Sequence, residues 1–259
     1  AWAWHKSRAK NVAKIVDKVA SIFPFEYDVY KEAGANVEFV GHPLVDIVKP
    51  KMTEAEANTF AGKQDDRKLI LIMPGSRLME IEKMLPTLLE AAKLIKKQLP
   101  EVDFVMPRAG SIPLQMLEEK IKASGISVKI TEGNNYDLFS VADLALATSG
   151  TVTLEAALCG LGSVIVYRTN PLTYFIAKLV VNIPHIGLPN IVAGKSVLPE
   201  LIQDDFTPEK VAKEAISLLE RERNAKMKED LAYVKERLGK PGAVGRVAEL
   251  VLKIAGEKK

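Results

Sequence analysis

Cysteine and histidine are scarce in this sequence, which has one cysteine and three histidines among 259 residues. The single Cys159 cannot form an internal disulfide, and no group of cysteines and histidines has the spacing of metal ligands. A reducing compartment is therefore favoured. We expect neither a bound metal nor a cofactor.

Long hydrophobic runs are also missing. The longest apolar stretches, such as residues 172–181, are interrupted by Lys178 and are shorter than the roughly 20 residues of a membrane-spanning helix. No charged segment followed by an apolar one indicates a signal peptide. These absences predict a soluble or peripheral protein. The chain starts at Ala1 rather than at methionine, and we interpret it as part of a larger protein.

Charge of one sign is not in large excess. The 36 basic and 33 acidic side chains leave a net charge of +3, which is too small to indicate a nucleic-acid partner. With 47% hydrophobic residues, the chain is long and apolar enough to bury a full core.

What the sequence does contain is a series of short β-branched runs, most of them followed by a helical pattern. The runs cover residues 37–40, 68–73, 102–106, 128–131, 143–147 and 164–167. Strands that alternate with helices predict a parallel sheet covered on both faces, and the nearly continuous apolar character of the runs supports this burial. The sequence predicts an α/β fold with a doubly wound, Rossmann-like parallel sheet.

We expect three parts along the chain. A polar, weakly periodic segment follows the turn at residues 41–43, which places a domain boundary near residue 46. Residues 1–45 are assigned to one domain and residues 46–223 to the doubly wound domain. Residues 224–259 are expected to form terminal helices that pack back on the first domain.

Helix signals define the end of the doubly wound domain. Its last helix is expected to have Thr207 as N-cap and Pro208 as first residue. Two further helices are predicted near residues 225–238 and 243–255, because the Gly-Lys-Pro-Gly stretch at 239–242 suits a helix stop.

The segment Pro74-Gly75-Ser76-Arg77 directly follows a predicted buried strand and opens a helix. Glycine lets the backbone approach a ligand, the helix start presents free N–H groups, and arginine supplies a charge suited to phosphate oxygens. This pattern favours a diphosphate seat. A simple tight turn is the alternative, and this segment alone does not decide between the two.

A second polar turn follows another predicted strand, with the sequence Thr148-Ser149-Gly150-Thr151. Glu155 comes within the first turns of the next helix, where its carboxylate is suited to accept both hydroxyls of a ribose. The alternative is that Glu155 only complements the helix dipole. Because both turns lie at the carboxyl edge of one sheet, together they predict a nucleotide site. Neither a Gly-x-Gly-x-x-Gly fingerprint nor a P-loop is present, which argues against dinucleotides and against ATP or GTP hydrolysis.

A series of strings, in order from the first residue to about residue 203, resembles the lipid-A-disaccharide synthase family, and more specifically the C-terminal two-thirds of such a chain. The strings are Ala-Trp-Ala-Trp at 1–4, Gly-His-Pro-Leu-Val-Asp at 41–46, residues 74–77 with Glu80, residues 149–155, Tyr-Arg at 167–168 with Ala-Lys at 177–178, and Leu-Pro-Asn at 188–190.

The resemblance implies a GT-B architecture, in which two Rossmann-like domains face a cleft and the C-terminal one holds the sugar nucleotide. It implies a transfer of 2,3-diacylglucosamine from UDP to 2,3-diacylglucosamine 1-phosphate. The residues expected around the UDP phosphates are Gly75, Ser76, Arg77, Ser149, Gly150 and Thr151, with Glu155 on the ribose. Glu132 and Gly133 are expected near uracil, and Tyr167, Arg168 and Asn190 beside the cleft.

No Asp-x-Asp pair offers a carboxylate clamp for a divalent ion on the diphosphate. The charge of the leaving group is therefore expected to be met by Arg77, with Arg168 and helix N-termini as further candidates. The family resemblance implies an aspartate base upstream of Ala1. We assign no base, and we expect this chain by itself to bind UDP but to transfer almost no sugar. His5, His42 and His185 are interpreted as structural.

Two segments are candidates for contact with lipid. Lys6, Lys10, Lys14 and Lys18 recur every four residues and predict a basic amphipathic helix, which is either a solvated face or a surface for anionic lipid. The apolar residues at 172–180 either belong to the core or contact acyl chains. The resemblance implies a cytoplasmic enzyme that is peripheral on the inner membrane, with a homodimer left open.

Two rival functions remain. Another UDP-N-acetylglucosamine-using GT-B enzyme, either the peptidoglycan N-acetylglucosaminyltransferase or a UDP-N-acetylglucosamine 2-epimerase, would share such a UDP site. A non-catalytic UDP-binding module is the alternative from a different class.

Overall fold

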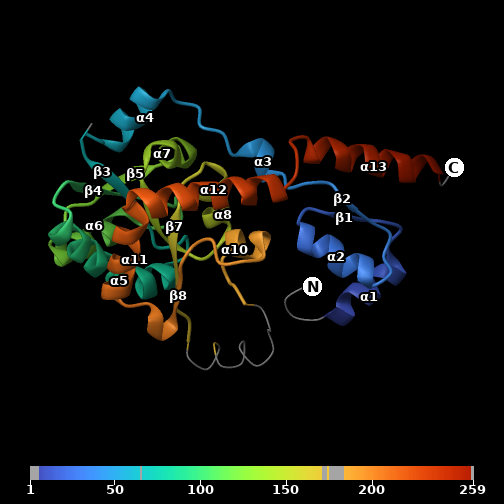
Figure 1. The fold of residues 1–259 in the computed structure, drawn as a ribbon, viewed down its shortest axis with the longest axis horizontal. Helices are drawn as coiled ribbons and strands as arrows, with labels where there is room; N and C mark the ends of the chain where they lie inside the picture. Colours follow the sequence, from blue (N-terminus) through green and yellow to red (C-terminus); the bar gives the residue numbers. More distant parts are fainter. Residues whose placement is uncertain (1–5, 65, 171–173, 175–183, 258–259) are drawn as a thin grey trace.

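The computed structural model describes residues 6–64, 66–170, 174 and 184–257, and its larger part is built on a six-stranded sheet (Figure 1). All neighbouring strands are parallel, and their order is β5-β4-β3-β6-β7-β8. The strands are β3 (Lys68–Met73), β4 (Val102–Arg108), β5 (Lys129–Glu132), β6 (Leu144–Thr148), β7 (Ser163–Tyr167) and β8 (Glu200–Ile202). Counted within this sheet the order is 3-2-1-4-5-6, which is that of the doubly wound nucleotide-binding fold.

Both faces of the sheet are buried, as the apolar strand runs predicted. Ile70 and Ile72 of β3 join one core cluster, whereas Leu69 and Leu71 join the other, because successive side chains of a strand point to opposite faces. The first cluster is covered by α5 (Leu78–Gln98), α6 (Leu114–Ser124), α11 (Pro208–Leu219) and α12 (Arg221–Arg237). The second is covered by α4 (Glu54–Ala61) and α7 (Asn135–Val141), while α8 (Thr151–Leu158) contributes to both.

The N-terminal part of the chain forms a small unit on the other side of the molecule (Figure 1). It contains α1 (Lys6–Ile15), α2 (Pro24–Glu32) and a two-stranded parallel sheet of β1 (Val19–Ser21) and β2 (Val37–Phe39). The short α3 (Leu44–Ile47) leads from this unit to α4. The remaining described elements are α10 (Leu188–Ala193), η1 (Gln203–Asp205) and α13 (Ala243–Glu257).

The six predicted strand runs each overlap an observed strand, and the N-cap at Thr207 is confirmed. The Thr207 side chain accepts a hydrogen bond from the Lys210 N–H at 3.3 Å, and Pro208 is the first helical residue. The strands β1 and β8 were not predicted. Each has only three residues and is too short for a clear alternating or apolar pattern.

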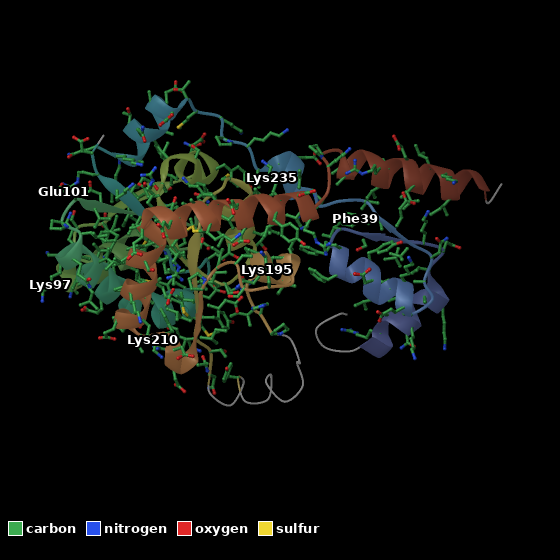
Figure 2. All side chains as sticks on the ribbon, viewed as in Figure 1. Phe39, Lys97, Glu101, Lys195, Lys210 and Lys235 are labelled. Atoms are coloured by element: carbon green, nitrogen blue, oxygen red, sulfur yellow. The ribbon has the colours of Figure 1, made fainter. Side chains whose placement is uncertain are left out.

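The terminal helices do not act as one unit. Met227, Leu231 and Val234 of α12 are buried in the same core cluster as Ile70, so α12 packs on the six-stranded sheet. In contrast, α13 lies beside β1 and β2 in Figure 1, and the Arg246 Nε donates to the Val40 carbonyl at 2.8 Å. Helix α13 thus contacts the N-terminal unit, whereas α12, which carries Lys235 in Figure 2, lies on the six-stranded sheet. The division of the chain into three domains stays a prediction.

The prediction of one basic helix with four lysines is wrong at its end. Helix α1 ends at Ile15, and Lys18 lies beyond it, where its Nζ pairs with Glu38 of β2 at 2.6 Å. The second candidate for lipid contact, residues 172–180, lies outside the described residues except for Tyr174. Within the described part of the chain, no helix has both the length and the apolar character needed to cross a bilayer.

Candidate functional site

Strands β3 and β6 are neighbours at the centre of the sheet, and the chain leaves them toward opposite edges. In doubly wound sheets, ligands bind at this point, in the crevice outside the carboxyl ends of the two strands. A cavity of about 400 Å³ is present there. It is lined by Met73, Gly75, Ser76, Arg77, Glu80, Pro107, Ala109, Asn135, Thr148, Ser149, Gly150, Thr151, Val152 and Glu155. Seven of the residues predicted to bind substrate are therefore brought together.

The turn after β3 bends sharply because Gly75 adopts φ +117°, a conformation that side chains rarely allow. Its last residue, Arg77, precedes α5 and leaves its side chain 79% exposed at the rim of the cavity. The Glu80 carboxylate folds back over the turn. Its Oε2 accepts from the N–H groups of Ser76 at 2.9 Å and Arg77 at 3.2 Å, and its Oε1 accepts from Arg77 Nη1 at 2.8 Å.

The turn after β6 contributes hydroxyl groups and the start of α8. Thr148 is almost fully buried, and its Oγ1 has no hydrogen-bond partner among the described residues although it borders the cavity. The Ser149 hydroxyl donates to the Ile186 carbonyl at 3.1 Å, which fixes the turn while leaving lone pairs free. Thr151 is exposed and begins α8. The Thr148 Oγ1 itself has almost no accessible surface, so the residues of this turn that are open to a ligand are Gly150 and Thr151.

Glu155 of α8 lies half-buried at the floor of the cavity. Burial raises the pKa of its carboxyl group. Within the described part of the chain, no hydrogen bond or ion pair to this carboxylate is formed. A carboxylate that is desolvated without a partner is available to accept hydrogen bonds from a ligand.

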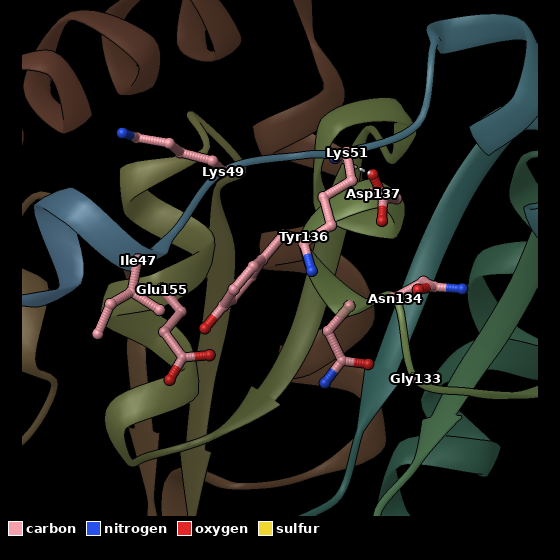
Figure 3. A pocket seen from close by; sticks show the side chains of 9 residues that line it. Ile47, Lys49, Lys51, Gly133, Asn134, Tyr136, Asp137 and Glu155 are labelled. Carbon is pink, nitrogen blue, oxygen red and sulfur yellow. Dashed lines mark hydrogen bonds between the residues drawn. The ribbon is translucent and has the colours of Figure 1, made fainter.

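A second cavity of about 350 Å³ adjoins the first and shares Asn135 and Glu155 with it (Figure 3). Its wall includes Gly133, Asn134, Tyr136, Lys49 and Lys51. Figure 3 shows the Tyr136 hydroxyl directed toward the Glu155 carboxylate. The pKa of Tyr136 is raised, first by burial and then by the negative charge of Glu155.

The segment that connects the N-terminal unit to α4 is fastened beside this second cavity. Asp137 is 3% exposed, and its Oδ1 accepts from the N–H groups of Lys51 at 2.6 Å and Met52 at 2.7 Å. The connection therefore runs over the wall to which Gly133 and Tyr136 belong.

Five predicted site residues are not brought into the first cavity. Glu132 pairs instead with Arg108, whose Nη2 lies 2.5 Å from Glu132 Oε1. Its neighbour Gly133 lines the second cavity, so of the two residues expected near uracil only Gly133 borders a cavity of the site. Tyr167 is half-buried at the end of β7, opposite Ile202 of β8, and lines neither cavity.

Arg168 and Asn190 are engaged elsewhere. The Arg168 guanidinium donates to the carbonyls of Gln203 and Phe206 and lies 4.9 Å from the Phe206 ring centroid. Asn190 is fully buried, and its side chain accepts from the N–H groups of residues 197 and 198 and donates to the Leu198 carbonyl and to Glu200. This leaves Asn190 no capacity for a ligand, and the geometry places Arg168 away from the cavity.

The histidines behave differently from one another. His42 is 7% exposed, its Nδ1 accepts from the Leu44 N–H at 3.1 Å, and burial lowers its pKa. The structural interpretation of His42 therefore holds. His185 has a carboxylate neighbour that we did not expect, because its Nδ1 lies 3.8 Å from Glu200 Oε1. His5 lies outside the described residues. Among the residues described, no group of three or more His, Cys, Asp or Glu side chains could hold a metal ion.

Several lining residues were not assigned to the site from sequence. Thr148 was part of the polar turn, and its place at a strand end was the signal that identified the turn. Asn135, Tyr136, Lys49 and Lys51 had no such signal, since they reach the cavities only through the packing of α7 and the chain connection.

Comparisons with known proteins show what this chain is similar to. The family model described as lipid-A-disaccharide synthetase matches residues 1–253. Lipid-A-disaccharide synthase of Geobacter metallireducens is 42% identical over 259 residues, which is 100% of this chain and 67% of the relative. The synthase of Geobacter sulfurreducens is 42% identical over 258 residues, with 99% and 67% covered. The chain thus spans about two-thirds of the length of these relatives.

Solved structures share the fold at low sequence identity. UDP-GlcNAc 2-epimerase from Neisseria meningitidis, bound to UDP-GlcNAc, has a TM-score of 0.64 and 17% identity, with 93% of this chain and 62% of that chain covered. A co-structure of S. aureus MnaA with UDP has a TM-score of 0.66 and 16% identity, with 95% and 62% covered. WaaG, a glycosyltransferase involved in lipopolysaccharide biosynthesis, gives a TM-score of 0.52 at 14% identity, with 84% and 57% covered. The predicted GT-B type of α/β fold is confirmed.

Proposed function

The chain belongs to the lipid-A-disaccharide synthase family, the glycosyltransferases of lipid A biosynthesis, and on this premise we propose that the β3–β6 cavity holds the UDP part of the sugar donor. The donor is UDP-2,3-diacylglucosamine and the acceptor is 2,3-diacylglucosamine 1-phosphate. The products are the β-1,6-linked disaccharide 1-phosphate and UDP.

One observation carries this assignment. The two polar turns converge on a single cavity, and the half-buried Glu155 carboxylate at its floor is left without a described partner. Residues 75–77, 150 and 151 supply N–H groups, hydroxyls and one guanidinium for the diphosphate. The Ser149 N–H and hydroxyl donate instead to the carbonyls of Val166 and Ile186 and so hold the second turn. Glu155 supplies the acceptor for the two ribose hydroxyls. The uracil then extends toward the second cavity, where Gly133 and Tyr136 lie.

In this arrangement Arg77 stabilises the leaving group. As the glycosidic bond to UDP breaks, negative charge grows on the diphosphate, and the exposed guanidinium at the rim meets that charge. The starts of α5 and α8 add their N–H groups. Because the charge is larger in the transition state than in the bound donor, the effect of Arg77 falls on the rate of transfer.

We assign no general base to the described residues. His42 is not open to a substrate, because its ring is buried and its Nδ1 accepts a backbone hydrogen bond. His185 lies beside Glu200, near the Asn190 side chain, in a segment that neither cavity includes.

The test is a calorimetric titration of the chain with UDP in EDTA, with uridine as the ligand that lacks phosphate. Saturable UDP binding is expected, and Arg77→Ala should weaken it by about 1.5–3 kcal/mol, the range for a hydrogen bond to a charged group. The same variant should leave uridine binding unchanged. Loss of UDP binding on chelation, with recovery in magnesium, would contradict the metal-free diphosphate seat.

Assays of product separate the rival functions when they use a protein of the relatives' full length, because we expect the 259-residue chain by itself to bind UDP without transfer. Disaccharide formation from the two lipid substrates in detergent micelles supports the synthase, whereas epimerisation of UDP-N-acetylglucosamine supports the 2-epimerase. Transfer of N-acetylglucosamine to a peptidoglycan precursor supports the peptidoglycan N-acetylglucosaminyltransferase. UDP binding without any of these reactions supports a binding module.

A peripheral position on the cytoplasmic face of the inner membrane is part of the proposal. Helix α1 has no acidic residue in its first turn, exposes Lys10 and Lys14, and leaves Ile15 80% exposed at its end. Basic side chains beside an exposed apolar residue suit a surface of anionic lipid. Sedimentation with vesicles containing anionic lipid, but not with neutral vesicles, is the expected result. The homodimer stays a prediction.

A further inference from the structure

The donors that the proposed function assigns to the diphosphate are already occupied by a side chain of the protein. Glu80 accepts from the N–H groups of Ser76 and Arg77 and from the Arg77 guanidinium. Its side chain is 20% exposed and lines the cavity together with those residues. A carboxylate thus sits where three donors converge at the entrance to α5.

Gly75 is shaped to this carboxylate. A Cβ added to Gly75 would lie 2.5 Å from Glu80 Oε2 and 2.6 Å from Glu80 Cβ, which is closer than real side-chain carbons approach. The missing side chain of Gly75 therefore makes room for Glu80 in this conformation. Position 75 therefore needs a glycine for two reasons, which are the space taken by the Glu80 side chain and the positive φ of the turn.

The same donors cannot serve two anions at full strength. Each backbone N–H has one proton, so a phosphate oxygen that takes it must displace the carboxylate oxygen. A carboxylate and a diphosphate held within a few ångströms of each other also repel, because both carry negative charge. The partial exposure of Glu80 gives its carboxylate a way out into the cavity.

Resting on the proposed function, we propose that Glu80 is an internal counter-ion that exchanges with the diphosphate. In the free protein Glu80 neutralises Arg77 and satisfies the turn. When the donor binds, its diphosphate takes over these three donors and Glu80 swings aside. After transfer, Glu80 returns and competes with UDP, so that it lowers UDP affinity and speeds UDP release.

A second helix of this protein provides a matched control. Glu56 of α4 accepts from the Thr53 N–H and hydroxyl, both at 2.8 Å, and thus caps its helix in the same way. Among the residues that the structure describes, no arginine donates to Glu56, and this glutamate lines neither cavity. If only the loss of a helix cap mattered, variants of Glu56 and Glu80 should change in the same way. A change in UDP binding is expected only for the Glu80 variants.

The experiment compares Glu80→Gln, Glu80→Ala and Glu56→Gln in the 259-residue chain. Calorimetry measures the Kd of UDP and of uridine, and stopped-flow displacement measures the UDP dissociation rate. If Glu80 occupies the seat in about nine of ten free molecules, its removal lowers the UDP Kd about tenfold, since apparent affinity scales with the competent fraction. Both Glu80 variants should show a lower Kd and slower UDP release, with an unchanged Kd for uridine. Glu56→Gln should change neither ligand.

The outcomes separate the two ideas. A UDP Kd that is unchanged or higher in both Glu80 variants, while wild type binds UDP, overturns the exchange role and leaves Glu80 as a helix cap. An equal shift for UDP and uridine also overturns it, because uridine has no phosphate to compete. If wild type and all variants fail to bind UDP, the proposed function falls, and the exchange role falls with it.

Discussion

The Asp46 carboxylate accepts a hydrogen bond from the Gly242 N–H at 2.7 Å, although the two residues are 196 positions apart in the sequence. Its other oxygen accepts from the N–H of Ala243, the first residue of α13, at 3.2 Å. Close by, the His42 N–H donates to the Leu238 carbonyl at 2.9 Å. The string at residues 41–46 contributed to the family resemblance. The chain passes twice between the N-terminal unit and the large sheet, and these hydrogen bonds connect the first passage, at residues 41–46, with the second, at residues 238–243.

Replacing Asp46 should loosen α13. Asp46→Ala removes the acceptor for two N–H groups at the helix start, and loss of such a cap costs about 1 kcal/mol. Hydrogen exchange measured by mass spectrometry should become faster in residues 243–257 and stay unchanged in the strands of the large sheet. Asp28→Ala, at an exposed position of α2, is the control and should not affect α13. Equal exchange in both variants would show that α13 is held by its other contacts.

Glu155 should control the affinity for the ribose. Glu155→Ala leaves two ribose hydroxyls without their charged acceptor, so UDP binding should weaken by about 1.5–3 kcal/mol. The control ligand is 2′,3′-dideoxy-UDP, which wild type and variant should bind almost equally. If the variant bound both nucleotides less tightly by the same factor, Glu155 would have a structural role.

Without a ligand, the ionised Glu155 carboxylate should lower the stability of the folded protein, and this effect should depend on pH. Burial raises the pKa of Glu155 in the folded state, so the unfolded chain releases this proton at a lower pH than the folded protein does. The stability of wild type must then fall as the pH rises from the unfolded pKa through the folded pKa. Glu155→Gln removes the charge, and its melting temperature should exceed that of wild type at pH 7 but not below about pH 4. A constant difference between the two proteins over this range would contradict the assignment.

The architecture could be predicted because burial leaves a clear mark on these strands. Ile70 and Leu71 point to opposite faces, yet both are fully buried, so the run from Leu69 to Met73 is apolar throughout. The parallel sheet and the turns at its carboxyl edge follow from such runs. The strand β8 has no such apolar run in the sequence, because its three residues are only half-buried.

The site was predictable only where it follows the strand ends. Gly75 and Ser149 belong to local turns, and the order of the sheet brings the two turns together. Arg168 also follows a strand, but its guanidinium turns to the carbonyls after β8, a contact that no local pattern encodes. Tyr136 reaches Glu155 from a different helix, and only the packing of α7 against α8 creates that pair.

The packing of α12 depends on a glycine at the start of β7. A Cβ added to Gly162 would lie 1.9 Å from the Met227 Sδ, and Met227 is 3% exposed. Gly162→Ala should destabilise the protein by about 1–3 kcal/mol, the range for overpacking in a core. The loss should be smaller when Met227→Ala is already present, because the clashing atoms are gone. Gly245→Ala, which meets nothing within 4 Å, is the control and should not destabilise. Additive losses in denaturant unfolding would exclude the contact.

Asn190 was expected beside the cleft, and the structure gives it a different task. Its Nδ2 donates to Glu200 Oε1 at 2.7 Å, and Glu200 Oε2 accepts from the Ile186 N–H at 2.9 Å. The Ile186 carbonyl in turn accepts from the Ser149 hydroxyl at 3.1 Å. Asn190 therefore supports the second turn through three hydrogen bonds in series, without a ligand contact of its own.

Removing Asn190 should cost stability more than UDP affinity. Asn190→Ala leaves the N–H groups of Val197 and Leu198 without an acceptor in the core, and each unsatisfied group costs about 1–3 kcal/mol. Chemical denaturation should show a loss of at least about 2 kcal/mol without UDP present, from the same unsatisfied groups. The matched control is Asn224→Ala, whose side chain donates only one hydrogen bond, to the Leu218 carbonyl at 3.1 Å, and which should lose less. UDP affinity of the folded Asn190 variant should change much less than that of Glu155→Ala. A stable Asn190→Ala protein that binds UDP as weakly as Glu155→Ala would restore Asn190 to the ligand contacts.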